Sequence, residues 1–151
     1  MKFEKFGDFF NSDNLGSTLF ILFMSYRKFA QKETAKHDLS LVQGFCLLLI
    51  NDFKEINQND LAKGLFVTKG AVTKAIKKLE EDGYIFREKQ HKDKRNFLLK
   101  LSKKGEEIIP ILHEIVDNWE SKMVVGGLSD EFMETLNDLT YKSVQINLEN
   151  E

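Results

Sequence analysis

The residues of this 151-residue chain best suited to chemistry form a cationic binding pattern and not a catalytic set. Lys69, Gly70, Thr73, Lys74 and Lys77 are spaced so that a helix would place them on one face. Such a face, basic near its start and without a large apolar group, can enter a DNA major groove, where Thr and Lys reach base edges or phosphates. Many surface helices have a solvated lysine face, so the flanking elements must decide between the two interpretations.

The residues around this face predict a helix-turn-helix. Asn57 and Thr68 stand where the N-caps of two successive helices are expected. Val67 and Val72 are placed as a hydrophobic staple around the second cap, and Gly83 stands where a left-handed residue would end the second helix. The expected buried stripe of the second helix consists of Val72, Ala75, Ile76 and Leu79.

A cationic hairpin is expected directly after the helix pair. Residues 84–90 and 96–101 are rich in aromatic and branched side chains, and the polar residues 91–95 separate them. A basic tip in this position is a candidate wing that lies along the minor groove. Arg95 could insert into a narrow minor groove, with Asp93 bracing it or the turn. The candidate wing contacts are Arg87, Lys89, Lys92, Asp93, Lys94 and Arg95.

Charge is distributed unevenly along the chain. Residues 57–105 contain 13 Lys/Arg and 6 Asp/Glu, a net charge of +7, whereas the rest of the chain contains 9 and 18, a net charge of −9. A basic segment inside an acidic chain is expected of a module that binds double-stranded DNA. Chance clustering of lysine is the alternative.

Three motifs in register make the chain resemble the MarR family of winged helix-turn-helix regulators. They are Leu-Glu-x-x-Gly at 79–83, Asp-x-Arg at 93–95 and Leu-Ser-x-x-Gly at 101–105. Further matching residues lie at 59–62 and 67–73. The chain departs from the family pattern at Phe66, where a small residue, often Gly, is common, and at Gly70, where Ser or Pro is frequent.

The resemblance implies a mainly α fold with a small β-hairpin wing (α+β). It implies one MarR-type domain over residues 1–151, with a helical dimerisation region at 1–36 and 103–151 and a winged helix-turn-helix lobe at 37–102. A homodimer would place the helix at 68–82 of each subunit in a major groove of a pseudo-palindromic operator. The expected contacts on that helix are Thr68, Lys69, Gly70, Thr73, Lys74 and Lys77, and repression is the expected outcome.

The flanking segments agree with a dimer but leave alternatives open. A helix is expected over residues 15–36 that is apolar on most sides, which is more than a small monomer readily covers. Packing into the chain's own core is the competing explanation. By resemblance, a small aromatic effector would bind between the dimerisation helices and the lobe. Phe23, Tyr26 and Phe45 are the candidate lining residues, and each suits the core equally well.

Other chemistry finds little support in the sequence. The histidines His37, His91 and His113 are dispersed, so no metal, cofactor or enzymatic activity is expected. Cys46, the single cysteine, agrees with a reducing compartment. It suits an inert apolar position in a central helix better than an oxidant sensor. No export signal or membrane-spanning stretch is recognisable, so a cytoplasmic protein without a membrane partner is expected.

The alternative from a different functional class is a winged-helix module that binds a protein and no DNA. It predicts an apolar patch on the second helix, where the sequence has Lys and Thr.

Overall fold

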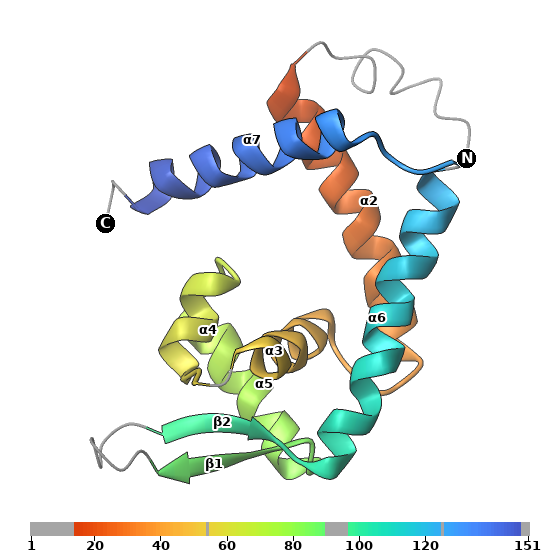
Figure 1. Ribbon diagram of the computed structural model, residues 1–151. Helices are drawn as coiled ribbons and strands as arrows, with labels where there is room; N and C mark the ends of the chain where they lie inside the picture. The colour runs from red at the N-terminus through yellow and green to blue at the C-terminus, as the bar shows by residue number, and fades with distance from the viewer. Residues whose placement is uncertain (1–13, 54, 90–96, 125, 149–151) are drawn as a thin grey trace. The chain divides into compact units, whose positions relative to one another are not determined.

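The computed structural model describes residues 14–53, 55–89, 97–124 and 126–148 (Figure 1). The chain divides into two compact units, residues 1–119 and 120–151. The predicted α+β class is confirmed. The elements, in chain order, are α2 (Leu15–Ala35), α3 (Leu41–Asp52), α4 (Gln58–Gly64), α5 (Lys69–Glu81), β1 (Ile85–Lys89), β2 (Phe97–Leu101), α6 (Lys103–Met123) and α7 (Asp130–Leu148).

The caps of the helix-turn-helix are those that the sequence predicts. The Asn57 side chain accepts hydrogen bonds from the backbone N–H groups of Asn59 and Asp60, and the Asp60 carboxylate accepts one in return from the Asn57 N–H. Thr68 Oγ1 accepts from the Ala71 N–H at 3.2 Å and so begins α5. Gly83, with a φ of 74°, follows the C-cap of α5 in the left-handed region, where glycine has no steric penalty.

The sequence predicts a helix over residues 37–51 with Asp38 or Ser40 as its N-cap, and the structure decides between the two caps. Ser40 is the N-cap, because its hydroxyl accepts from the Gln43 N–H and the Gln43 side chain accepts from the Ser40 N–H. Asp38, the other predicted cap, has a φ of 58° and lies in the turn after α2. The helix therefore begins at Leu41.

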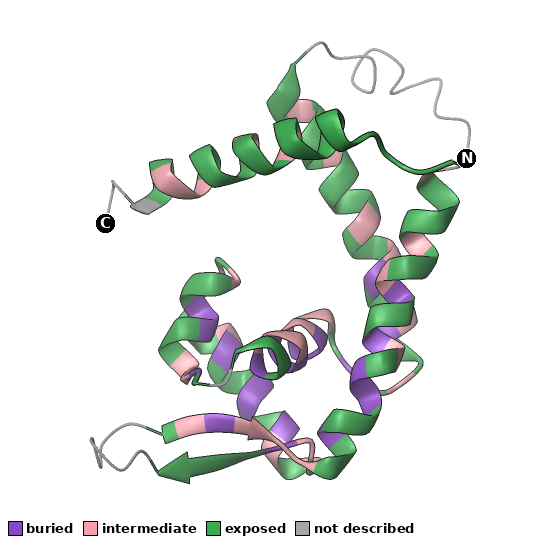
Figure 2. Ribbon diagram, viewed as in Figure 1, coloured by how far each residue is buried: buried purple, intermediate pink, exposed green. Residues whose placement is uncertain are grey.

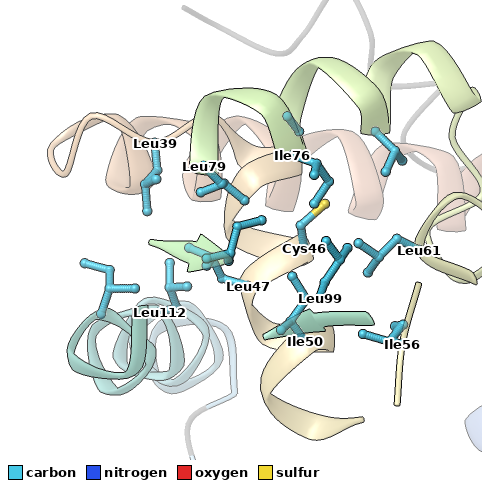
Figure 3. Packing of buried hydrophobic residues seen from close by; sticks show 14 of the residues in the cluster. Leu39, Cys46, Leu47, Ile50, Ile56, Leu61, Ile76, Leu79, Leu99 and Leu112 are labelled. Atoms are coloured by element: carbon cyan, nitrogen blue, oxygen red, sulfur yellow. The ribbon is translucent and has the colours of Figure 1, made fainter. Parts of the chain in front are cut away.

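The core of the first unit forms around α3 (Figure 3). Leu47 of α3 is fully buried, together with Leu61 of α4, Ile76 and Leu79 of α5, and Leu99 of β2. Burying a side chain of this size contributes about 1.5–3 kcal/mol. This shared core fixes α5 on the lobe, and the residues on its other face are exposed. Figure 2 shows further buried residues in α3, α4 and α6.

The two strands pair antiparallel, with Ile85 opposite Leu101 and Arg87 opposite Leu99. Alternation along a strand places Ile85, Arg87 and Lys89 on the face whose Ile85 and Leu99 are buried. Arg87 therefore lies on the core-facing side of the hairpin.

The Leu-Ser-x-x-Gly motif joins the hairpin to α6. Ser102 Oγ donates to the Gly83 carbonyl at 2.6 Å and accepts from the Gly105 N–H at 3.1 Å. A Cβ at position 105 would lie 2.2 Å from the Tyr84 carbonyl oxygen, so only glycine fits this approach.

The second unit contains the end of α6 and all of α7. Gly126 and Gly127, with φ of 97° and 84°, separate these helices. Ser129 Oγ accepts from the Phe132 N–H at 3.2 Å and so caps the start of α7. Among the described residues, no helix is long and apolar enough to cross a membrane.

Candidate nucleic-acid interface

The predicted contact residues of α5 share one solvent-facing surface. Lys69, Gly70, Thr73, Lys74 and Lys77 are all exposed. The opposite side of the helix is anchored in the core. Its buried residues are Val72, Ala75, Ile76 and Leu79. We call the exposed set the α5 face.

Positive charge is concentrated in the first half of the α5 face. Lys77 lies 3.8 Å from Glu81, and Lys78 lies 2.8 Å from Asp82. Within the described residues, no such ion pair involves Lys69 or Lys74. The exposed pairs at the end of the helix contribute at most about 1 kcal/mol each. The start of α5 is therefore the part best suited to a polyanion, because the helix dipole also favours an anion there.

Gly70 is open to its surroundings. A Cβ at this position would meet no described atom within 4 Å, so the fold does not require glycine here. A phosphate could approach the backbone closely at this point.

Phe66, in the turn before α5, is 64% exposed and has a φ of 51°. The left-handed conformation explains why a small residue suits this place, because a side chain there costs roughly 1–2 kcal/mol. The Phe66 side chain is largely open to solvent in this turn.

Arg87, predicted as a wing contact, makes hydrogen bonds within the protein. Its Nε and Nη2 donate to Glu80 Oε1 and Oε2 at 2.8 and 3.1 Å, and Nη2 also donates to Gln58 Oε1 at 3.3 Å. Gln58 Nε2 in turn donates to Thr73 Oγ1 at 2.6 Å. Sequence reasoning missed Gln58 and Glu80. The signal that could have found them was the strand alternation that places Arg87 on the side of buried Ile85.

Of the other predicted wing contacts, one lies in β1 and the rest lie at the hairpin tip. Lys89 is exposed at the end of β1. The predicted contacts at the hairpin tip, Lys92, Asp93, Lys94 and Arg95, lie outside the described residues.

Two of the three predicted effector residues line the same cavity. Tyr26 and Phe45 line a cavity of about 20 Å³ formed by α2, α3 and α6, whereas Phe23 is 55% exposed and does not line it. A cavity of this size holds about one water molecule and no aromatic ring. Burial raises the pKa of Tyr26, whose ring packs edge-on against Trp119 at 4.9 Å.

Cys46 lies in the middle of the core with no exposed surface. Burial raises the pKa of its thiol to about 12. The thiolate, which is the form that oxidants attack, is therefore disfavoured.

Comparison with known proteins places these features in a family. The MarR family model matches residues 39–97. The HTH-type transcriptional regulator SarZ of Staphylococcus haemolyticus is 32% identical over 101 residues, which are 65% of this chain and 69% of SarZ. The chain belongs to the MarR family. It is a transcriptional regulator of that family, and the relatives are named as regulators and not as enzymes.

Solved structures agree with this assignment. A crystal structure of MarR is 30% identical, with a TM-score of 0.79, and the match covers 92% of this chain and 97% of that one. A MepR–DNA complex from S. aureus, 22% identical, has the same fold with a TM-score of 0.76 over 89% of this chain and 97% of that one.

Proposed function

We propose that this MarR-family regulator acts as a homodimeric repressor on a pseudo-palindromic operator. The α5 face of each subunit enters a major groove, and the wing, with Arg95 at its tip, grips the flanking minor groove and phosphates. The observation on which this rests is the α5 face itself. Lysine and threonine are exposed on a helix whose other side is fixed in the core.

The comparisons support DNA as the partner. MepR, which shares the fold, was solved bound to DNA. The protein-binding alternative requires an apolar patch on α5, and none of the large exposed apolar side chains of the described residues belongs to α5.

Exposed apolar surface supports the homodimer. In α2, Phe20 is 56% and Phe23 is 55% exposed, which favours a partner surface over packing into the subunit's own core. In α7, Phe132 is 51% exposed. Apolar surface on both flanking helices suits a second copy of the chain, by analogy with the family. The other large exposed apolar residues of these helices are Leu15, Leu19, Leu22, Met24, Met133, Tyr141 and Ile146.

Release by a small aromatic anion is the regulatory part of the proposal. The cavity beside Tyr26 and Phe45 is the starting point, and it must widen to admit a ring. A ligand that binds only the widened state shifts the population toward it, and a lobe spacing unsuited to the operator would follow.

The test is binding of the purified protein to DNA from upstream of its own coding region, measured against salt. We expect a steep loss of affinity as salt rises, with a slope near −0.9 for each phosphate contact, and a large advantage over random DNA. Light scattering of the same sample checks for the dimer. Weak binding that neither salt nor sequence changes would support the protein-binding alternative.

A further inference from the structure

Four side chains join the hairpin to the α5 face. Glu80 of α5 holds Arg87 of β1, Arg87 holds Gln58 of α4, and Gln58 reaches Thr73 in the middle of the α5 face. Gln58 and Glu80 are partly buried, and Arg87 is on the core-facing side of its strand. The last member of this chain of hydrogen bonds is one of the residues expected to meet DNA.

The direction of each hydrogen bond is fixed by chemistry. An arginine side chain only donates, so the Gln58 oxygen must face Arg87 and its amide nitrogen must face Thr73. Thr73 Oγ1 accepts from that nitrogen, and its own proton goes to the Lys69 carbonyl at 2.8 Å. Among the described residues, these two bonds use the hydroxyl proton and one of its two lone pairs. Thr73 is left with one acceptor lone pair and a methyl group.

We propose that Arg87 is a positioning residue that sets base preference through Gln58 and Thr73, and is not a phosphate contact. The inference rests on the proposed binding of DNA by the α5 face. A Thr73 held as an acceptor suits an amino group of adenine or cytosine, and its methyl suits the thymine methyl. A base pair with a carbonyl oxygen at the same point of the groove would be disfavoured, because that oxygen and Thr73 Oγ1 would both be acceptors with no proton between them.

The ion pair itself adds little to stability. The side chains of Arg87 and Glu80 are 38% and 31% exposed, and exposed pairs are weak. Variants that lack it should therefore fold, which a thermal melt of each variant checks.

The experiment uses the whole protein and a duplex that the wild type selects from a randomised pool. Affinities for this duplex and for its single-base-pair variants are measured over a range of salt with wild type, Arg87→Met, Gln58→Leu and the double variant. Lys89→Met is the matched control, because Lys89 is an exposed cation on the same strand and the same strand face.

We expect Arg87→Met to reduce the preference for the selected base pair at one position of each half-site by roughly tenfold, with the salt slope unchanged. Gln58→Leu should do the same, and the double variant should have no weaker preference than either single variant, because all three break one chain of bonds. Lys89→Met should weaken all duplexes equally and lower the slope by about 0.9 for each subunit.

Two results would overturn the inference while the proposed function stands. One is an Arg87→Met variant that behaves like Lys89→Met, with a lower slope and equal weakening on every duplex. The other is a double variant whose loss of base preference equals the sum of the losses in the two single variants. If the wild type selects no preferred duplex, the proposed function fails, and this inference fails with it.

Discussion

The exposed face of α5 and the exposed face of the first half of α2 differ in the polarity of their side chains. Lysine, threonine and glycine cover the first, whereas Phe20 and Phe23 are more than half exposed on the second. α5 is anchored in the core on its other side, through Ile76, whereas α2 is anchored further along its length, through Ala30 and Thr34 in its second half. One small core thus supports two exposed surfaces of different composition, one polar and cationic and one apolar.

The two surfaces differ in how much they need a partner. A charged face is well solvated in water, so it is stable without a ligand and can bind one reversibly. Burying a Phe side chain contributes about 1.5–3 kcal/mol, which each exposed Phe lacks in a lone subunit. The apolar face therefore gains much more free energy from a partner surface than the charged face does. We therefore expect subunit association to be tight and DNA binding to depend strongly on salt.

The largest effect is expected from charge placed on the apolar face. Phe20→Glu with Phe23→Glu should raise the dimer dissociation constant roughly 100-fold or more, because the interface would lose two aromatic rings and bury carboxylates in their place. Sedimentation equilibrium measures it. Lys28→Glu, at an exposed position of the same helix, is the control. An unchanged dimer would mean that α2 packs elsewhere.

The next effect is expected on the α5 face. Lys69→Ala with Lys74→Ala should weaken operator binding roughly 10- to 100-fold at low salt and lower the salt slope by about 0.9 for each phosphate that is no longer neutralised. The dimer constant should not change. Lys142→Ala on α7, an exposed lysine 3.4 Å from Asp138, serves as the control and should leave DNA binding as it is. Equal weakening by both variants would indicate a nonspecific effect of charge.

A third prediction concerns the hairpin tip. Arg95→Ala should weaken operator binding about tenfold or more without changing the dimer, because a narrow minor groove strengthens the field that attracts arginine. Electrophoretic mobility shifts measure the affinity. Affinity equal to that of the wild type would exclude this residue as a contact.

The smallest effect is expected at Cys46, which belongs to neither surface. Peroxide should affect DNA binding of the wild type and of Cys46→Ser equally, because burial keeps the thiol protonated. A thiol whose pKa is raised on folding contributes stability below its ordinary value of 9.0 and loses that contribution as the pH rises toward 12. Native protein should therefore react slowly with iodoacetamide at pH 8. Fast labelling, or release of DNA by peroxide in the wild type alone, would restore the sensor hypothesis.

Local chemistry explains what the sequence could predict. Asn57, Thr68 and Gly83 each act within a few residues of their own position, so the helix ends and the α5 face could be expected without a structure. The bond between Gln58 and Thr73 and the ion pair between Arg87 and Glu80 could not, because they depend on how three elements pack. For the same reason the sequence did not reveal the bonds of Arg87 within the protein, and it placed Phe23 in a pocket that it does not line.

The most direct measurement is a dimethyl sulfate footprint of the protein on its operator, since this reagent methylates guanine N7 in the major groove. If α5 of each subunit occupies a major groove, protected guanines should appear in two clusters about one helical turn (~10 bp) apart, and Lys69→Ala with Lys74→Ala should weaken both clusters together. Tight, sequence-specific binding without protection at any guanine N7 of the half-sites would contradict the placement of α5 in the major groove.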